Sequence, residues 1–263
     1  MTDRRETTAV WAAVLGTTVG DAWLRRDEPR APELVERYQA ALTQLERGAP
    51  LAYATGRIGF RALDLRIDAR ALIPRPETEG LVDLVLRHAR QGLAADIGTG
   101  SGCIALALAT EGAFDRVIAV ERSPAAAALA RENVERIAPR TPVDVVEGDL
   151  LGPLTGRRYQ VIVSNPPYLT DAEYDALEPA VRDYEPREAL VSGPDGLAAT
   201  RRLLAGGAAL LEPGGVLALE IDERRGDTVR ELARANGWAR IDVLDDIFGR
   251  PRYVLAFAHP REA

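Results

Sequence analysis

From residue 93 onward, short runs of apolar and mainly β-branched residues alternate with segments that have the periodicity of helices. The runs that predict strands cover residues 93–97, 116–121, 143–147, 161–163, 216–221, 239–244 and 252–258. Parallel strands are joined by crossover helices that cover the faces of the sheet, so this alternation is typical of such a sheet. The sequence therefore predicts an α/β fold with a mostly parallel sheet of seven strands.

Residues 161–168 read Val-Ile-Val-Ser-Asn-Pro-Pro-Tyr. The β-branched residues predict a buried strand, which the two prolines must end. Pro166 and Pro167 lack N–H groups and have a nearly fixed φ, but their carbonyl groups still accept hydrogen bonds. We expect a stiff rim where Asn165, the carbonyl of Pro166 and the ring of Tyr168 receive a planar group that carries N–H donors. The alternative is an ordinary strand followed by a turn, because Asn-Pro is a common turn start.

A glycine-rich loop lies between the strand at 93–97 and the next helix. It consists of Gly98, Thr99, Gly100, Ser101 and Gly102. Glycines there allow a tight strand-to-helix turn and a close approach of the backbone to a ligand. Glu121 ends the following strand, where a carboxylate can accept both hydroxyl groups of a ribose. The spacing Gly-x-Gly-x-Gly departs from the dinucleotide fingerprint Gly-x-Gly-x-x-Gly, and it favours S-adenosylmethionine over NAD.

Asp149 ends the third strand, where its side chain can accept a hydrogen bond from an adenine amino group while Leu150 packs on the ring. The alternative for Asp149 is a simple turn residue. Four strand ends then present Gly98, Glu121, Asp149 and Asn165 on one rim, and open α/β sheets bind ligands at that edge. We therefore expect a Rossmann-like cofactor site to which Asn165 also contributes.

Residues 9–47 have helical patterning, which is clearest in residues 33–47. Pro32 suits the first turn of that helix, and Gly48 suits its C′ position. We expect Trp11 and Trp23 to anchor the core of this region, because tryptophan side chains are highly buried on average.

Residues 51–73 contain short apolar–polar alternations that predict a β-hairpin. Residues 72–79 read Leu-Ile-Pro-Arg-Pro-Glu-Thr-Glu, and their two prolines favour an extended linker. Thr78 is placed to cap the helix that follows. The predicted domains are a small N-terminal helical domain with a hairpin linker, residues 1–73, and a second domain, residues 74–263.

Towards the C-terminus, residues 169–196 predict a long loop, and loops of that length often bind a partner or ligand. A helix is expected over residues 197–211. Pro213, Gly214 and Gly215 are then expected to turn into the strand at 216–221.

The composition excludes several classes of function. Cys103, the single cysteine, rules out an intrachain disulfide and a cysteine-cluster metal site, so no metal is expected. No lysine occurs, which excludes a lysine Schiff base. A net charge of -7 argues against non-specific duplex binding, although it does not exclude a local basic face, and no direct nucleic-acid substrate is expected. No apolar run is long enough to span a membrane, and residues 1–6 do not resemble a signal peptide, so the expected location is the cytoplasm.

Several motifs resemble those of the HemK/PrmC-type protein-(glutamine-N5) methyltransferases, which modify peptide chain release factors. The resemblance covers about residues 50–252 and is most specific in the linker at 72–79. The matching motifs are Pro-Leu-Ala-Tyr at 50–53, the linker at 72–79, Asp-Ile-Gly-Thr-Gly-Ser-Gly at 96–102, residues 163–168, Glu-Pro-Arg at 185–187 and Gly-Leu at 196–197. Asp222 stands where the family usually has glycine, and the region before Pro32 matches poorly.

The resemblance implies a class I methyltransferase domain, S-adenosylmethionine as cofactor, and a release factor as partner that is held with the help of the N-terminal domain. The accepting glutamine would belong to the Gly-Gly-Gln loop of that factor. Arg75 and Glu77 would line the mouth of the active site, and we expect a monomer.

A neutral amide nitrogen is a poor nucleophile, so the task of such an enzyme is mainly positioning. We expect the side-chain oxygen of Asn165 and the carbonyl of Pro166 to accept the two amide N–H groups. Tyr168 would stack beside the amide, and Pro167 would stiffen the turn.

Three alternatives share some of these features. An adenine-N6 nucleic-acid methyltransferase would present the same two N–H donors, but it would need base flipping and a basic DNA-facing module. A ribosomal-protein glutamine methyltransferase would use the same chemistry. A binding or assembly protein with a relic cofactor pocket is the alternative without catalysis.

Overall fold

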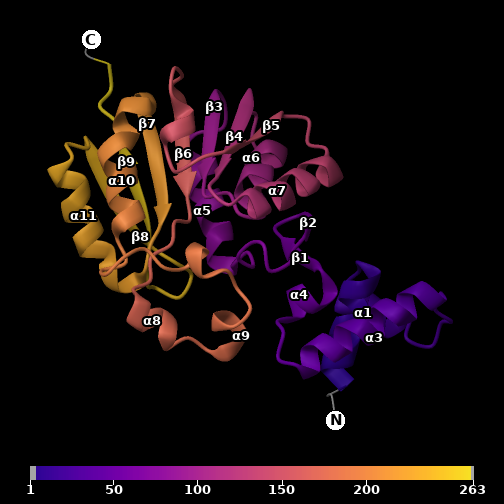
Figure 1. The fold of residues 1–263 in the computed structure, drawn as a ribbon. Coiled ribbons are helices and arrows are strands. Elements are labelled where there is room, and N and C mark those ends of the chain that lie inside the picture. Colours follow the sequence, from indigo (N-terminus) through magenta and orange to yellow (C-terminus); the bar gives the residue numbers. More distant parts are fainter. Residues whose placement is uncertain (1–3, 262–263) are drawn as a thin grey trace.

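The structure is a computed structural model that describes residues 4–261. Its N-terminal part is helical and lies to one side of the sheet, at the lower right of Figure 1. The helices of this part are α1 (Arg4–Leu15), α2 (Val19–Leu24), α3 (Pro32–Glu46) and α4 (Leu51–Thr55). Pro32 begins α3 and Gly48 follows it with a φ of +90°, which confirms the predicted start and end of that helix.

The two N-terminal tryptophans differ in their surroundings. Trp11 stacks on Tyr38 with ring centroids 4.1 Å apart, against the small core formed by α1, α3 and α4. Trp23 is 53% exposed, so its predicted role as a core anchor is wrong. The short helix α2 buries only Ala22. The guanidinium of Arg26 lies over one face of the Trp23 ring.

The predicted hairpin is confirmed as β1 (Arg57–Phe60) paired antiparallel with β2 (Leu63–Arg66), whereas the short helix α4 before it was not foreseen. Phe60 and Leu65 belong to the same hydrophobic cluster as the first helices of the sheet domain. Asn133 accepts a hydrogen bond from the N–H of Arg66 and donates one to its carbonyl. This packing groups the hairpin with the sheet, and the division of the chain at residue 73 stays a prediction.

Within residues 4–261, seven strands form one mixed sheet, as predicted. The strands are β3 (Leu93–Ile97), β4 (Arg116–Glu121), β5 (Val143–Glu147), β6 (Tyr159–Ser164), β7 (Leu211–Glu220), β8 (Arg240–Asp245) and β9 (Pro251–Phe257). Their order is β5-β4-β3-β6-β7-β9-β8, and β9 runs antiparallel to both of its neighbours. The carboxyl ends of β3, β4, β5 and β6 therefore meet at one edge.

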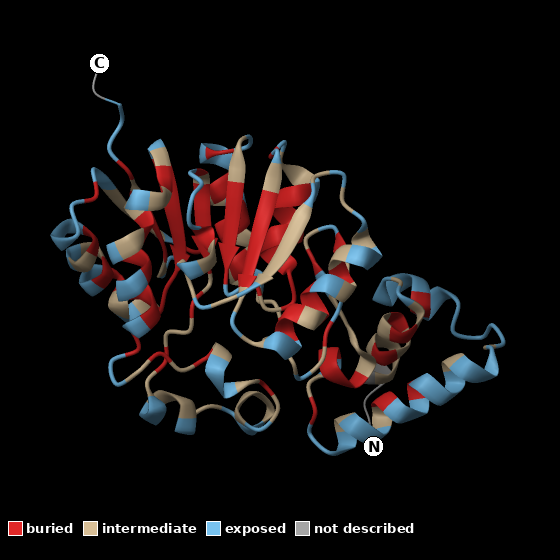
Figure 2. Cartoon of the chain, turned by 45° about the horizontal axis from the view of Figure 1, so that its top comes forward, coloured by how far each residue is buried: buried red, intermediate tan, exposed pale blue. Residues whose placement is uncertain are grey.

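Helices cover both faces of the sheet, so its central strands are buried, as the red strands of Figure 2 show. One face carries α5 (Pro76–His88), α6 (Cys103–Glu111) and α7 (Pro124–Ile137). The other face carries α10 (Ala198–Gly207) and α11 (Gly226–Ala235). Burial on both faces explains why these strands read as continuous apolar runs.

The expected turn before β7 is instead part of that strand. Leu211 pairs with Tyr159 and Val216 pairs with Val161, so the residues between them bulge out of the ladder. Helix α10 accordingly ends at Gly207 and is followed by the 3-10 turn Ala208–Leu210. The predicted helix over 197–211 was too long, because Leu211 pairs with Tyr159 of β6 and so belongs to β7.

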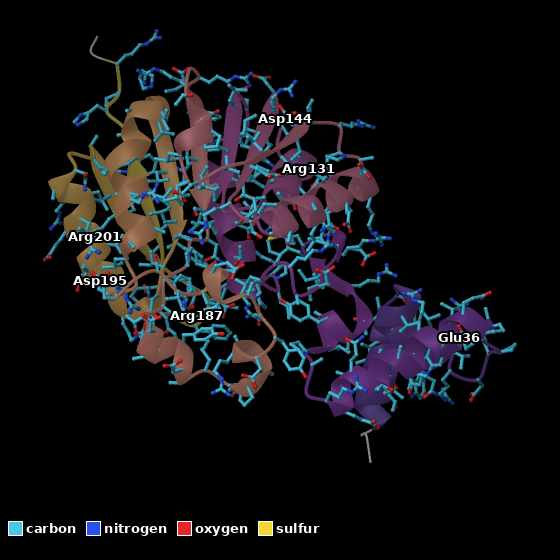
Figure 3. All side chains as sticks on the ribbon, in the orientation of Figure 1. Glu36, Arg131, Asp144, Arg187, Asp195 and Arg201 are labelled. Atoms are coloured by element: carbon cyan, nitrogen blue, oxygen red, sulfur yellow. The ribbon has the colours of Figure 1, made fainter. Side chains whose placement is uncertain are left out.

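The long segment at 169–196 is folded and lies beneath the carboxyl edge of the sheet in Figure 1. It contains α8 (Asp171–Asp175), α9 (Pro179–Arg182) and the 3-10 turn Arg187–Ala189. Leu169 and Val191 form an isolated parallel bridge that brings the start of this segment close to its end. The charged side chains of Arg187 and Asp195, labelled in Figure 3, mark this segment on the surface.

Candidate active site

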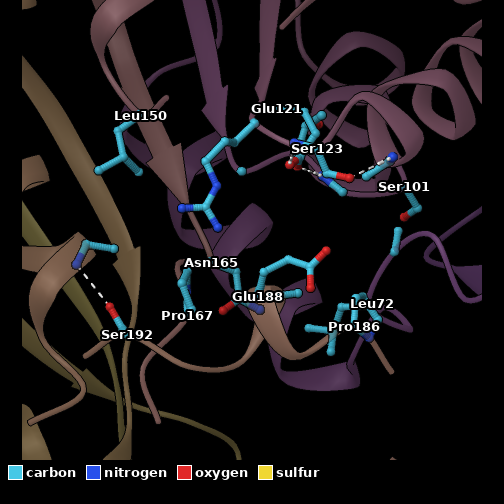
Figure 4. A pocket seen from close by; sticks show the side chains of 18 of the residues that line it. Leu72, Ser101, Glu121, Ser123, Leu150, Asn165, Pro167, Pro186, Glu188 and Ser192 are labelled. Atoms are coloured by element: carbon cyan, nitrogen blue, oxygen red, sulfur yellow. Dashed lines mark hydrogen bonds between the residues drawn. The ribbon is translucent and has the colours of Figure 1, made fainter. Parts of the chain in front are cut away.

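A cavity of about 340 Å³ opens at the carboxyl edge of β3, β4 and β6. Figure 4 shows Glu121, Ser123 and Leu150 in its upper half, and it shows Asn165, Pro167, Glu188, Leu72 and Pro186 in its lower half. The linker before α5 and the segment 186–193 thus close the cavity from outside the sheet. Four of the five residues of the predicted glycine loop line the cavity, and Gly102 does not.

The glycine loop has a backbone that requires glycine. Gly98, Gly100 and Gly102 have φ values of +72°, +55° and +85°. A Cβ added at Gly98 would meet no atom within 4 Å outside its chain neighbours, and Gly98 itself lines the cavity. At Gly102 a Cβ would lie 3.6 Å from Ala130, an ordinary contact, so the positive φ and not crowding favours glycine there. The loop therefore leaves room for a ligand close to its backbone.

Asp96 holds the glycine loop from behind, and sequence reasoning gave it no role. Its fully buried Oδ2 accepts hydrogen bonds from Thr99 Oγ1 at 2.5 Å and from the N–H of Ala105 at 3.0 Å. Burial raises the pKa of the Asp96 carboxyl to about 7. The sequence could have indicated Asp96, because it is an acidic residue in an otherwise apolar strand that leads directly into the loop.

Glu121 is fixed by two backbone donors. Its carboxylate accepts hydrogen bonds from the N–H of Gly100 at 2.9 Å and from the N–H of Ser123 at 2.8 Å, one on each oxygen. A carboxylate has about four lone-pair sites, so both oxygens can still accept from a ligand. This geometry suits the predicted contact with two ribose hydroxyl groups.

Asp149 and Leu150 also line the cavity. The carboxylate of Asp149 lies 2.7 Å from the guanidinium of Arg202 on α10, a partner that the sequence did not suggest. Leu150 has a φ of +49°, an uncommon backbone state for a residue with a side chain. Both positions remain compatible with the predicted adenine site, which stays a prediction.

Asn165 is held by a residue far away in the chain. Its Nδ2 donates to Thr78 Oγ1 at 3.1 Å, and Thr78 Oγ1 donates to Glu220 Oε2 at 2.7 Å. The prediction that Thr78 caps α5 is wrong, because Arg75 is the N-cap and Pro76 the first helical residue. Sequence reasoning gave no role to Glu220, at the end of β7, although it is an acidic residue within an apolar strand, as Asp96 is.

The residues after Asn165 occupy different places. Pro167 lines the cavity, whereas Pro166 is buried. The N–H of Tyr168 donates to the carbonyl of Leu190 at 3.1 Å, and burial raises the pKa of its phenol above the usual range. Neither Pro166 nor Tyr168 is among the described residues that line the cavity, so their predicted contacts with a substrate stay predictions.

Arg75 and Glu77 also separate. Arg75 lines the cavity and pairs with Glu185 at 2.5 Å, and the buried Glu185 also accepts from the N–H of Ile73. Glu77 does not belong to the described lining, and its carbonyl accepts from the hydroxyl of Tyr253 at 2.6 Å. The predicted site role is therefore supported by position for Arg75 alone.

Asp222 helps to hold the segment 169–196. It pairs with Arg225 at 3.0 Å, and Arg225 in turn pairs with Glu173 of α8 and donates to the carbonyl of Asp195. A Cβ at Gly196 would lie 2.4 Å from the carbonyl of Tyr168, so the segment crosses the Asn-Pro-Pro-Tyr strand end at close range. The departure from glycine at position 222 thus has a structural use.

No group of three or more metal-ligating side chains occurs within residues 4–261. In the same range, each helix is too short or too polar to cross a bilayer.

Known proteins match nearly the whole chain. Residues 1–56 match the family model of the PrmC N-terminal domain, and residues 78–183 match that of the methyltransferase small domain. The first match corrects the expectation that the region before Pro32 departs from the family. A solved methyltransferase of Pyrococcus furiosus shares the fold with a TM-score of 0.58 and 22% identity, covering 85% of this chain and 98% of its own.

Curated relatives are more similar in sequence. The release factor glutamine methyltransferase of Moorella thermoacetica is 44% identical, over 89% of this chain and 83% of the relative. The protein of the same name from Geobacter sulfurreducens is 38% identical, over 95% of this chain and 88% of the relative. By this likeness, the chain belongs to the family of release factor glutamine methyltransferases.

Proposed function

We propose that the protein transfers a methyl group from S-adenosylmethionine to the side-chain amide nitrogen (N5) of the glutamine in the Gly-Gly-Gln loop of peptide chain release factors. The observation that carries the proposal is that Asn165 lines the same cavity as the glycine loop and Glu121. An acceptor for amide N–H groups therefore lies beside features that suit an adenosine ligand. The names of the relatives support the same substrate for this chain.

The cavity residues fit S-adenosylmethionine. The open space in front of Gly98 lets a ligand approach the loop backbone, and Glu121 retains acceptor sites for ribose hydroxyl groups. Asp149 and Leu150, which line the cavity, would contact the adenine. When bound, S-adenosylmethionine supplies a methyl group on a positively charged sulfur, which keeps the bonding electron pair as the methyl leaves.

The residues at the end of β6 would act on the acceptor. The Oδ1 of Asn165 and the carbonyl of Pro166 accept the two amide N–H groups, which turns the nitrogen lone pair towards the methyl group. These same acceptors stabilise the positive charge that grows on the nitrogen during transfer. The methylated nitrogen then loses one proton to water, because a protonated amide is strongly acidic. No strong base is required, and positioning supplies most of the catalysis.

The test uses the purified protein, methyl-labelled S-adenosylmethionine and an unmodified release factor. Mass spectrometry should find the mass of one methyl group on the loop glutamine. Asn165→Ala should abolish transfer, while calorimetry with S-adenosylmethionine shows binding close to that of the wild type. Full turnover by Asn165→Ala, or methylation at another residue, would refute the proposal.

The same protein and labelled S-adenosylmethionine are incubated in parallel with DNA and with a ribosomal protein, to test the two alternative substrates. Adenine in DNA offers the same N–H donors, and a ribosomal protein offers other glutamines. The relatives favour neither substrate, and the net charge of -7 opposes non-specific DNA binding. A release factor substrate also supports the predicted cytoplasmic location, while the monomeric state stays a prediction.

A further inference from the structure

Three side chains from separate elements form a hydrogen-bonded chain behind the proposed acceptor site. Asn165 follows β6, Thr78 lies in the first turn of α5, and Glu220 ends β7. The two links measure 3.1 Å and 2.7 Å. Thr78 is 2% exposed and Glu220 is 1% exposed, so water does not compete for these bonds.

The direction of these hydrogen bonds follows from the number of protons. A threonine hydroxyl has one proton, and here it is donated to the carboxylate of Glu220. Towards Asn165 the Thr78 oxygen can therefore only accept. The NH2 end of the Asn165 amide must face Thr78, which turns its Oδ1 away from Thr78. The two ends of an amide have nearly the same shape, so the hydrogen-bond network decides which end points where.

We propose that Thr78 and Glu220 set the direction of the Asn165 amide and thereby make the site select a carboxamide over a carboxylate, an inference that rests on the function proposed above. Oδ1 of Asn165, together with the carbonyl of Pro166 that the proposed function assigns to the substrate, would give the site two acceptors. Glutamine supplies two N–H donors to them. Glutamate supplies none, and its charge would face two oxygens, which a site of this kind rejects strongly. Thr78 and Glu220 are positioning residues that act through Asn165.

The charge state of Glu220 controls this arrangement. The groups that act on it are Glu77 of α5, Cys103 of α6, Tyr168 after β6, and Arg252 and Tyr253 of β9. Burial is the main cause that raises the pKa of the Glu220 carboxyl to about 7, and Glu77 raises it further, whereas Thr78 and Arg252 lower it. Once protonated, Glu220 can donate to Thr78, which frees the Thr78 proton for the oxygen of Asn165. The amide then turns its NH2 end towards the substrate.

The first test compares Thr78→Val with Thr78→Ser in the full-length protein. Thr78→Val keeps the shape but leaves Asn165 free to turn, so kcat on the release factor should fall about 10-fold to 100-fold. Thr78→Ser restores the hydroxyl and should return kcat to within about 3-fold of the wild type. Calorimetry with S-adenosylmethionine reports folding and should show the same affinity in all three proteins.

The second test is the pH profile of kcat. The wild type should lose activity as the pH falls below about 7, because Glu220 takes up a proton. Glu220→Gln cannot titrate, so its lower activity should lack this acidic limb. A release factor with glutamate in place of the loop glutamine provides a third measurement. It should compete poorly against substrate on the wild type and better on Thr78→Val.

The outcomes separate this inference from the function on which it rests. A wild type that does not methylate the loop glutamine refutes both. An active wild type with an unchanged kcat in Thr78→Val, or with the same acidic limb in Glu220→Gln, overturns only the inference. Should Thr78→Val fail to bind S-adenosylmethionine, the pH profiles decide, and a wild-type profile that stays flat below pH 7 overturns the proposal.

Discussion

The guanidinium of Arg75 lies 2.5 Å from the carboxylate of Glu185, although 110 positions separate the two residues. This pair joins the linker before α5 to the segment after β6, and both contribute to the cavity wall. Glu185 is 4% exposed and also accepts from the N–H of Ile73 at 3.1 Å. The cavity therefore depends on one buried carboxylate that holds two distant segments together.

Glu185→Ala should lower the free energy of unfolding by about 1–3 kcal/mol, because it leaves the N–H of Ile73 and the guanidinium of Arg75 without their acceptor. Chemical denaturation measures this change. Asp183→Ala, which removes an exposed ion pair with Arg182 in the same segment, is the matched control and should have little effect. Equal stability of the two variants would show that Glu185 does not hold the linker.

Gly98→Ala should abolish most S-adenosylmethionine binding, because it adds a Cβ to a residue that lines the cavity. Gly237→Ala is a close control, since Gly237 has a φ of +74° and also meets no atom within 4 Å, but it lies outside the cavity lining. Both substitutions should cost about 1–2 kcal/mol of stability through backbone strain. Calorimetry should find weak binding in Gly98→Ala alone, and equal affinities would contradict the placement of the cofactor.

Glu121→Ala should weaken S-adenosylmethionine binding by about 10-fold or more, because the ribose loses a charged acceptor and Gly100 loses its partner. Glu147→Ala, at the end of the neighbouring strand β5 and exposed, is the comparison. Titration calorimetry on both proteins measures the difference. Retained affinity in Glu121→Ala would remove Glu121 from the site.

Asp96→Asn should change how stability depends on pH. The folded protein raises the pKa of this carboxyl from 3.8 to about 7, so it binds the proton more tightly than the unfolded chain does. The stability contribution is full below pH 3.8 and is lost as the pH rises towards 7. Glu220 acts in the same direction, so Asp96→Asn should flatten the decline without abolishing it. Denaturant unfolding at a series of pH values measures the slope, and an unchanged slope would refute the prediction.

Local sequence patterns predicted the strands of the sheet and one helix of the N-terminal part. The apolar runs predicted the strands, and Pro32 and Gly48 predicted the ends of α3. Burial on one or both faces, capping and turn formation depend on residues that are close in the sequence, so they can be predicted from the local sequence pattern. The motif at 161–168 and the glycine loop likewise indicated which edge of the sheet holds the site.

Errors arose where a distant contact outweighed a local preference. Thr78 has the residue type of a helix cap, but its hydroxyl lies between Glu220 and Asn165. Trp23 has the type of a core residue, but on the short helix α2 it is 53% exposed and its ring lies against the guanidinium of Arg26.

The sequence alone determined the succession of strands and helices along the chain, and it determined which strand ends could contact a ligand. The tertiary structure alone decided which buried acids support that edge: Asp96 behind the glycine loop, Glu185 under Arg75, and Glu220 behind Thr78. The physical reason is that hydrogen bonding to a buried carboxylate depends on groups that the fold brings together from separate elements. The residues next to each acid in the sequence do not indicate which distant groups these are.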